Sequence, residues 1–423
     1  GFDAYWTKFD SVGNRLWTKT IGGALDDLAV KINFDGSGNT FVTGHTYGGT
    51  VDFDPGPGVD NQASTGTIDT FISKYDSDGN YLWTVLFGGS DNDIGGDADV
   101  DEAGNVYITG YFNGTNVDFD PGAGTDLHSS AGQYDIYLCK FDNDGNYVWG
   151  VSFGDTEQDF VYDIDVYGSD IYLAGEFDGT VDFDPGAGTD DHTAASGPDM
   201  FIAKFDTSGA FQWARTVEGS GTDSANAIVS DGTDVFVHGL FQFTVDFDPG
   251  AGDDSHTAIG GSDRNLYVTS YSASGDYQWT RTWGGDGRAL DIEQNVWGIY
   301  TSSWFQGTVD FDPSSDTLDL TATGTRDTSV AAFDRFGDLQ WAINLDVDYA
   351  SGMASAPNGD LYVSGYTNNG DVDLDPGPVV LTYTNQGAED VVITKLERQL
   401  LKGKGYPELG FAAAVSSTSE AAG

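Results

Sequence analysis

A ten-residue acidic motif, VDFDPGAGTD at 181–190, holds the residues of this sequence best suited to bind an ion. Numbered from Asp182, its three aspartates stand at positions 1, 3 and 9. Calcium loops of the EF-hand type use ligands at positions 1, 3, 5, 7 and 9, with a bidentate Glu at 12. Here position 5 is Gly186 and position 12 is not acidic, so the motif matches a calcium loop only in part.

Near-copies of this motif recur along the chain, and four of them keep all three aspartates. The predicted calcium ligands are Asp52, Asp54, Asp60, Asp118, Asp120, Asp126, Asp182, Asp184, Asp190, Asp246, Asp248 and Asp254. A fifth copy has Asp310 and Asp312, with Asp316 shifted. A sixth keeps only Asp373 and Asp375. Calcium (Ca²⁺) bound here would be structural and weakly held, with a dissociation constant of ~10⁻⁴–10⁻³ M, as in extracellular modules.

The same motif can also be explained as turn chemistry. Asp side chains cap backbone amides in Asx turns, and Asp-Pro-Gly is an ordinary turn sequence. Strand alternation places Val181 and Phe183 on one side, facing a core, and both carboxylates of Asp182 and Asp184 on the other. The sequence leaves the calcium interpretation and the turn interpretation open.

Three histidines occupy one position after an acidic loop: His128, His192 and His256. A catalytic site is normally built once, and these residues lack the compact His/Cys spacing of a zinc site. Repetition therefore favours loop packing or hydrogen bonding. His45 and His238 stand in predicted second strands and are expected to be structural.

The remaining reactive side chains also indicate structural roles. Cys139, the single cysteine, replaces Ser73 or Ala203 of other repeats and is predicted to be a small strand residue, not a nucleophile. Five lysines share one repeat position and are expected to pair with carboxylates: Lys8, Lys74, Lys140, Lys204 and Lys395. The repeated tryptophans are predicted to pack in the blade core. Trp297 and Trp304 lie outside the repeat and are the better candidates for a ligand contact.

The sequence does not predict an enzyme. The turn in DSDGNYLW resembles the Asp-box of sialidases, but its spacing differs by a residue. A sialidase also needs an arginine cluster for the substrate carboxylate, and the eight arginines here are scattered. Fold alone does not confer activity.

Charge and composition limit the partners. The 423 residues carry a formal charge of −51, from 68 acidic and 17 basic residues, which repels nucleic acid and anionic membrane surfaces. No apolar run approaches the ~18 residues of a membrane span, and the start of the chain lacks the features of a signal peptide. With one cysteine there is no internal disulfide, so bound calcium is a candidate stabiliser for a secreted protein.

Two markers establish an internal repeat of about 64 residues. The motif VDFD, or its variant VDLD, begins at Val51, Val117, Val181, Val245, Val309 and Val372, in steps of 66, 64, 64, 64 and 63 residues. A tryptophan recurs with it, at Trp17, Trp83, Trp149, Trp213, Trp279 and Trp341.

Each repeat has the pattern of four β-strands. In one repeat they are expected at 26–35, 40–46, 69–76 and 81–89, runs rich in Val, Ile, Tyr, Phe and Trp that are bounded by Asp, Asn and Gly. Middle strands that are apolar on both faces need cover on both sides, which stacked four-stranded blades provide. We therefore predict an all-β, six-bladed β-propeller. A linear β-solenoid is the alternative, although the repeat is long for one coil.

The repeat resembles a known family. DTFISKYDSDGNYLWTVLFGG (69–89) and DEAGNVYITG (101–110) are similar to bacterial SBBP-type β-propeller repeats, and the likeness covers residues 3 to about 397. This resemblance implies an extracellular scaffold and supplies no catalytic motif. Repeat five departs most, because Ser270 replaces the lysine and SSWF replaces the Thr-Gly turn, so this blade is expected to be distorted or specialised.

Counting strands raises a question of closure. The strand 390–397 has no fourth partner in the repeat pattern, so the ring is expected to mix N- and C-terminal strands and to leave 3–10 or 390–397 surplus. Residues 400–423 break the repeat and suggest a linker or docking tail. The predicted domain is a propeller over 1–399, with repeat units at about 3–68, 69–134, 135–198, 199–262, 263–326 and 327–389.

These features predict a non-enzymatic, secreted or cell-surface propeller with a structural or adhesive role. Its partners would be protein or glycan, or copies of itself, without nucleic acid binding or membrane insertion. Two alternatives stay open. One is a subunit of an extracellular fibre, assembled by strand or tail exchange, and the other is a glycan hydrolase.

Overall fold

The computed structural model describes residues 1–11, 13–260, 264–368, 371–373, 382–384, 390–397 and 412–414. Within these ranges the chain forms strands and no helix, and thus no helix able to span a membrane. Six antiparallel sheets have four strands each. Within each sheet the four strands are hydrogen-bonded side by side in the order in which they occur along the chain. This is the topology of β-propeller blades, which confirms the predicted fold class.

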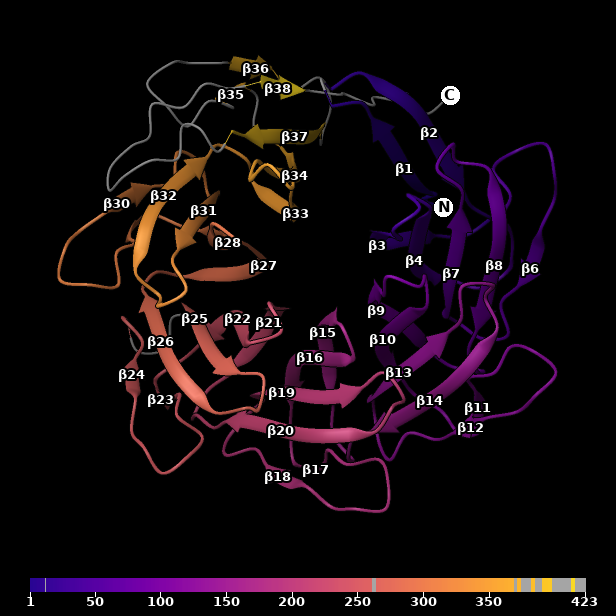
Figure 1. Ribbon diagram of the computed structural model, residues 1–423, viewed down its shortest axis with the longest axis horizontal. Helices are drawn as coiled ribbons and strands as arrows, with labels where there is room; N and C mark the ends of the chain where they lie inside the picture. Colours follow the sequence, from indigo (N-terminus) through magenta and orange to yellow (C-terminus); the bar gives the residue numbers. More distant parts are fainter. Residues whose placement is uncertain are drawn as a thin grey trace. The chain divides into compact units, whose positions relative to one another are not determined.

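The first compact unit contains residues 1–8 and 16–216. It holds three blades, shown in Figure 1 from indigo to magenta. Their strands are β3 (Asp27–Phe34), β4 (Thr40–Thr46), β7 (Asp69–Tyr75), β8 (Tyr81–Phe87), β9 (Asp93–Val100), β10 (Val106–Phe112), β13 (Asp135–Phe141), β14 (Tyr147–Phe153), β15 (Phe160–Tyr167), β16 (Asp170–Phe177), β19 (Asp199–Asp206) and β20 (Phe211–Val217).

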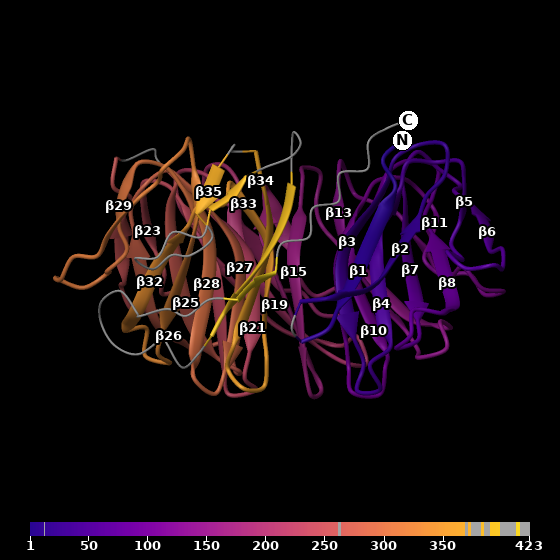
Figure 2. The same ribbon diagram turned by 90° about the horizontal axis from the view of Figure 1, so that it is seen from above.

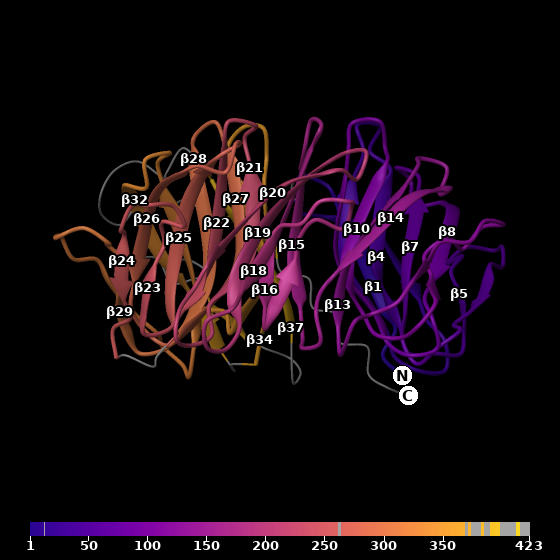
Figure 3. The same ribbon diagram turned by 90° about the horizontal axis from the view of Figure 1, so that it is seen from below.

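The second unit contains 9–15 and the described residues from 217 onward. It also holds three blades, and Figure 3 shows the strands of its first two running side by side. The strands of this unit are β21 (Ser224–Ser230), β22 (Asp234–Phe241), β25 (Asn265–Ser272), β26 (Tyr277–Trp283), β27 (Gly287–Asn295), β28 (Gly298–Phe305), β31 (Asp327–Phe333), β32 (Leu339–Leu345), β33 (Tyr349–Ser355), β34 (Leu361–Thr367), β37 (Asp390–Leu396) and β38 (Ala412–Ala414).

A short two-stranded hairpin stands between the second and third strand of every blade. Each of these hairpins contains one copy of the acidic motif, and in Figure 1 β17–β18 lies beyond the outer strand β20. The hairpins pair β5 (Thr50–Asp52) with β6 (Asn61–Ala63), β11 (Val117–Asp118) with β12 (Leu127–His128), β17 (Thr180–Asp182) with β18 (Asp191–Thr193), β23 (Thr244–Asp246) with β24 (Ser255–Thr257), β29 (Thr308–Asp310) with β30 (Asp319–Thr321), and β35 (Asp371–Asp373) with β36 (Thr382–Thr384).

The blade cores follow from the apolar pattern of the middle strands. Every residue of β4 and β7 is buried, because these strands are covered on both faces. The first strands carry a β-bulge at one repeat position, between Gly95 and Asp97 in β9 and between Ala289 and Asp291 in β27. A bulge bends a strand and increases its twist, so every blade begins with the same local distortion.

An additional hairpin precedes the first blade. It pairs β1 (Ala4–Phe9) with β2 (Arg15–Ile21) in a sheet of its own, and Figure 2 shows it beside β3 and β4. Trp6 is buried and packs against Tyr75, with ring centroids 4.7 Å apart. Lys8 Nζ donates to Ser77 O at 2.6 Å, as Lys74 Nζ donates to Asn143 O at 3.1 Å one blade later. The hairpin is therefore the outer half of a blade.

The expected mixing of terminal strands differs from the structure. The last blade is built from β33, β34, β37 and β38, all from the C-terminal part, and β1–β2 is the surplus pair. The missing fourth partner of 390–397 is β38, whose residues 412–414 pair with Lys395, Thr394 and Ile393. This strand stands 15 residues beyond β37 and lacks the repeat pattern, so the sequence did not reveal it. The rest of the predicted tail at 400–423 lies outside the described residues.

Candidate functional site

The first aspartate of each acidic loop organises the loop backbone. Asp182 Oδ1 accepts hydrogen bonds from the amides of Asp184, at 3.1 Å, and Asp190, at 2.8 Å. The carboxylate of Asp184 in turn caps the amide of Gly186 at 2.8 Å. Val181 and Phe183 are fully buried, which confirms the predicted alternation.

The other three complete loops repeat this geometry. The amide closing each loop lies 2.8 Å from the first carboxylate: Asp60 to Asp52, Asp126 to Asp118 and Asp254 to Asp246. Repeat five does the same with Leu318, whose amide lies 2.8 Å from Asp310. The loop fold thus needs a backbone amide at this position and not the third carboxylate.

The second and third aspartates contact different neighbours. Asp54 approaches Gly58 so closely that a β-carbon there would lie 2.0 Å from its Oδ2. The third carboxylate, that of Asp60, makes a contact outside the loop: it accepts a hydrogen bond from the hydroxyl of Tyr81 at the start of β8. Burial, followed by this hydrogen bond, raises the pKa of Tyr81, so the phenol stays protonated.

The structure therefore keeps the predicted ligands in one loop but gives them separate tasks. No group of three or more His, Cys, Asp or Glu side chains in the described part of the chain is arranged to hold a metal. Asp375 and the side chain of Asp373 lie outside that part. Amide capping supports the turn interpretation, and calcium in these loops stays a prediction.

The three repeated histidines fasten their loops to the outer strand. His128 Nδ1 lies 2.9 Å from Ser152 Oγ, and its Nε2 lies 3.4 Å from Asp126. His192 and His256 make the same two contacts, with threonine in place of serine. His128 also stacks on Phe119, with ring centroids 4.4 Å apart. The predicted role in loop packing and hydrogen bonding is confirmed.

The two second-strand histidines and the cysteine are buried. His238 is bound on both ring nitrogens, by Tyr267 O at 2.7 Å and Ser303 Oγ at 2.8 Å, and burial lowers its pKa to about 4. Burial also lowers the pKa of His45. Cys139 is fully buried, and burial raises the pKa of its thiol, which disfavours the nucleophilic thiolate.

The repeated lysines connect neighbouring strands and blades. Lys204 and Lys395 pair with Asp170 at 2.7 Å and Asp360 at 2.9 Å, as predicted. Lys140 instead donates to the carbonyl of Thr207 in the next blade, at 3.2 Å. Each of Lys74, Lys140 and Lys204 also lies over an aromatic ring of the second strand, at 4.7–5.2 Å from its centroid.

The repeated tryptophans pack between blades more than inside them. Trp83 and Trp149 are half-buried and donate to the carbonyls of Asn143, at 3.2 Å, and Thr207, at 3.3 Å, in the following blade. A β-carbon on Gly145 would lie 2.9 Å from the Trp83 ring, so the turn glycine is required for this contact. The predicted core position holds for Trp341, which is 4% exposed.

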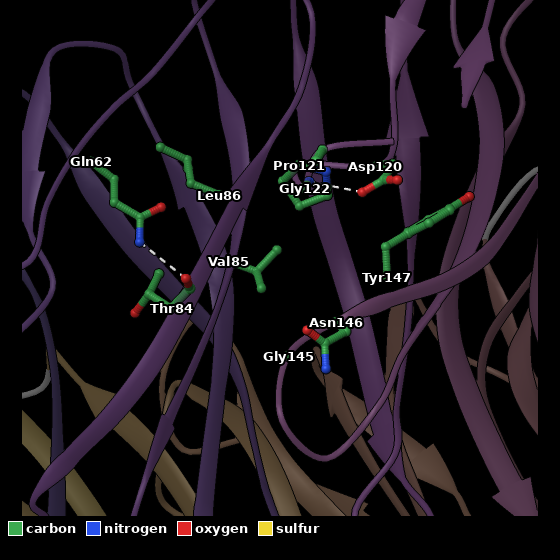
Figure 4. Close-up of a pocket in the computed structure, with 11 residues that line it drawn as sticks. Gln62, Thr84, Val85, Leu86, Asp120, Pro121, Gly122, Gly145, Asn146 and Tyr147 are labelled. Atoms are coloured by element: carbon green, nitrogen blue, oxygen red, sulfur yellow. Dashed lines mark hydrogen bonds between the residues drawn. The ribbon is translucent and has the colours of Figure 1, made fainter. Parts of the chain in front are cut away.

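A groove between the first two blades is an open site of the first unit. It has a volume of 390 Å³ and is lined by β8, the Asp120 loop and the turn at 145–147 (Figure 4). In Figure 4 Gln62 is hydrogen-bonded to Thr84 O, while Asn146 and Tyr147 stand across from Val85. The sequence did not reveal this groove because its walls come from different repeats.

The two off-repeat tryptophans are placed differently. Trp297 is half exposed in the turn before β28. Trp304 lies under the guanidinium of Arg326, whose Cζ is 5.7 Å from its ring centroid. The suggestion that they contact a ligand stays a prediction.

Two curated proteins are similar in sequence to parts of this chain. No protein-family model matches the chain. An uncharacterized WD repeat-containing protein, L264, of Acanthamoeba polyphaga mimivirus is 24% identical over 90% of this chain. The regulatory protein FlaEY of Caulobacter vibrioides is 28% identical over 41% of it. The alignments span 27% and 18% of those two proteins, so the chain corresponds to a minor part of each.

Solved structures with a similar trace include a Dos1 propeller, with a TM-score of 0.41, 9% identity and coverage of 94% of this chain and 87% of that one. A europium-containing methanol dehydrogenase has a TM-score of 0.35 and 13% identity, covering 87% and 70%. Blade topology and the internal repeats together define the class: this chain is a β-propeller repeat protein.

Proposed function

We propose that the protein is a non-enzymatic propeller scaffold of the bacterial SBBP type, which presents its blades to protein or glycan partners at a cell surface. The observation that carries this proposal is repetition. The loop histidines and the first aspartate of each acidic loop recur from blade to blade and make the same contacts with neighbouring protein atoms. An active site needs one constellation with free reactive groups, whereas these groups hold loops and blades together.

The groove in Figure 4 is the first candidate for the surface that binds a partner. It combines an outer strand, the ring of Tyr147 and the side-chain carbonyl of Asn146, whose amide nitrogen is held by Asp142, and this lining suits hydroxyl-rich or peptide ligands. The third blade has Ala210 and Phe211 at the equivalent positions, so it lacks the polar pair of this groove. The charge of −51 favours partners that are neutral or cationic, or contacts that include cations.

A glycan array probed with the intact protein, and repeated with an Asn146→Ala variant, tests this proposal. We expect binding to a restricted set of glycans that weakens at least tenfold in the variant. A matched substitution in the third blade, Phe211→Ala, should leave it unchanged. The protein should also be tested against a panel of glycosidase substrates. Hydrolysis that is abolished by substitution of a single residue would contradict the non-enzymatic role.

A second function, self-assembly by strand exchange, is favoured by one feature. In the described chain β1 pairs only with β2, whereas β7 and β13 each pair with a second strand as well. Tyr5 is 44% exposed although its counterparts Phe71 and Tyr137 are fully buried. Leu28, Val30, Ile32 and Phe34 also expose one side of β3. An open edge beside an apolar face is a template for added strands.

We infer that another copy of the chain supplies those strands. Light scattering after size exclusion, over a range of concentrations at high salt, measures the assembly. We expect higher species that disappear when Tyr5→Lys adds charge to the open edge. A Leu82→Lys change on exposed β8 is the control. A persistent monomer under these conditions would exclude the fibre role.

A further inference from the structure

Two buried carboxyl groups meet where the first blade packs against the second. Asp69 begins β7, Asp93 begins β9, and each is 1% exposed. A β-carbon added to Gly88 would lie 2.7 Å from Asp69 Oδ1 and 2.8 Å from Asp93 Oδ2. Both carboxyl groups therefore converge on the space beside this glycine.

Each of these groups has one oxygen bound by the backbone and one without a partner. Asp69 Oδ2 accepts the amide of Thr65 at 2.6 Å, and Asp93 Oδ2 accepts the amide of Gly89 at 2.5 Å. The two Oδ1 atoms are buried and make no hydrogen bond. Buried polar atoms are normally satisfied, and two facing carboxylates repel one another, so the arrangement calls for a positively charged occupant.

The next pair of blades repeats the arrangement. Asp135 and Asp159 are 4% and 0% exposed and converge on Gly154, where a β-carbon would lie 2.8 Å from Asp159 Oδ2. Asp135 Oδ2 accepts the amide of Ala131 at 3.0 Å, and its Oδ1 has no partner. Asp159 Oδ2 accepts the amide of Asp155 at 2.9 Å and its Oδ1 accepts that of Asp178 at 3.4 Å, so this pair leaves one oxygen without a partner where the first pair leaves two.

One pair of neighbouring blades in the second unit lacks both acids at once. Asn265 begins β25, where Asp69 begins β7, and the shared bulge register places Gly287 at the position of Asp93. Asn265 Oδ1 still accepts a loop amide, that of Ile259, at 2.9 Å. The backbone cap therefore needs no charge, and the loss of both acids together indicates that the two carboxylates serve one joint purpose.

The atoms that could bind a cation at the first pair, Asp69 with Asp93, are all oxygens. Thr65 is exposed, and its hydroxyl lies 3.0 Å from Asp69 Oδ2, 3.1 Å from the carbonyl of Gly88 and 3.0 Å from that of Gly89. Carboxylates, carbonyls and hydroxyls are ligands that calcium prefers, and the exposed Thr65 gives access from the surface. We propose that each facing pair, Asp69 with Asp93 and Asp135 with Asp159, binds a hard cation of the calcium class.

These sites are separate from the acidic loops, where the carboxylates cap amides. A proton is the competing occupant, because burial, opposed by the Gly89 hydrogen bond and aided by Asp69, raises the pKa of Asp93 to about 7. The two occupants differ in a measurable way. A cation site responds to calcium at fixed pH, whereas a shared proton does not.

Calorimetry with CaCl₂ and thermal unfolding of the full chain, with and without chelator at pH 8, test the proposal. The variants are Asp69→Asn/Asp93→Asn, Asp135→Asn/Asp159→Asn and all four together. Asn265 shows that asparagine supports the same loop. We expect calcium to raise the Tm of the wild type, each double variant to lose one bound ion, and the quadruple variant to lose both.

Asp54→Asn/Asp120→Asn, in the acidic loops, is the matched control and should keep both ions. The proposal is overturned if calcium up to about 10 mM, well above the weakest extracellular affinities, neither binds nor stabilises the wild type. It is equally overturned if the quadruple variant, folded by circular dichroism, binds as much calcium as the wild type. Loss of binding in the control alone would assign calcium to the acidic loops instead.

Discussion

Arg335, in the turn after β31, forms an ion pair with Asp234 at the start of β22 in another blade of the same unit. In two other blades the equivalent aspartate pairs with a lysine of the third strand: Asp170 with Lys204 and Asp360 with Lys395. Repeat five has Ser270 in place of that lysine. The blade predicted to be specialised therefore keeps the ion pair but takes its cation from a neighbour.

We expect Arg335→Ala to destabilise the protein by about 1 kcal/mol, because Arg335 is half exposed while Asp234 is nearly buried. Adding Ser270→Lys should recover most of this loss by restoring the pattern of the other blades. Urea unfolding of the single and double variants measures both effects. No recovery in the double variant would show that the two cations are not interchangeable.

Substitutions in an acidic loop separate capping from metal binding. Asp182→Ala removes the acceptor of two amides and should cost about 1–3 kcal/mol. Asp182→Asn keeps an acceptor oxygen and should cost much less. Thermal unfolding in chelator measures this difference. Equal losses for the two variants, seen only when calcium is present, would favour the calcium interpretation of the loops.

Stability in chelator should fall as the pH rises from about 4 to about 7. Burial raises the pKa of both Asp93 and Asp159 to about 7, so the folded state keeps protons that the unfolded chain releases near its ordinary pKa of about 4. The expected loss is on the order of 2–4 kcal/mol per carboxyl group. Denaturant unfolding across this pH range measures it, and Asp93→Asn should flatten the curve.

Below about pH 4 the trend should reverse. A hydrogen bond from Asn80 lowers the pKa of Asp76, and one from Ser208 lowers that of Asp206, so acid removes stabilising contacts in these turns. The same titration should therefore show maximal stability near pH 4–5. A curve that rises steadily to pH 7 would contradict the raised carboxyl pKa values.

Cys139 should be unreactive in the folded protein. Its side chain is fully buried and burial raises the pKa of the thiol, so the thiolate is rare and inaccessible. A thiol-specific chromogenic reagent should give no colour with native protein and one equivalent in denaturant. Cys139→Ser should abolish the denatured signal and Cys139→Ala should leave stability within about 1 kcal/mol.

The sequence predicted the blades because their determinants are local. Strand alternation, the Asp-Gly turns and the repeated apolar positions act within a few residues, so the strands at 27–34, 40–46, 69–75 and 81–87 agree with the expected runs. Structural roles for His128 and Cys139 followed from repetition alone. These features are visible in the sequence alone because each repeat can be compared with the others.

Tertiary structure decided which groups meet. Asp69 and Asp93 stand 24 residues apart in different blades, and only packing shows that their carboxyl groups converge while the aspartates of one acidic loop serve separate amides. The pairing of β38 with β37 and of Arg335 with Asp234 has the same origin. Such contacts join segments with no common periodicity, so burial and charge in the folded chain, and not spacing along it, determine them.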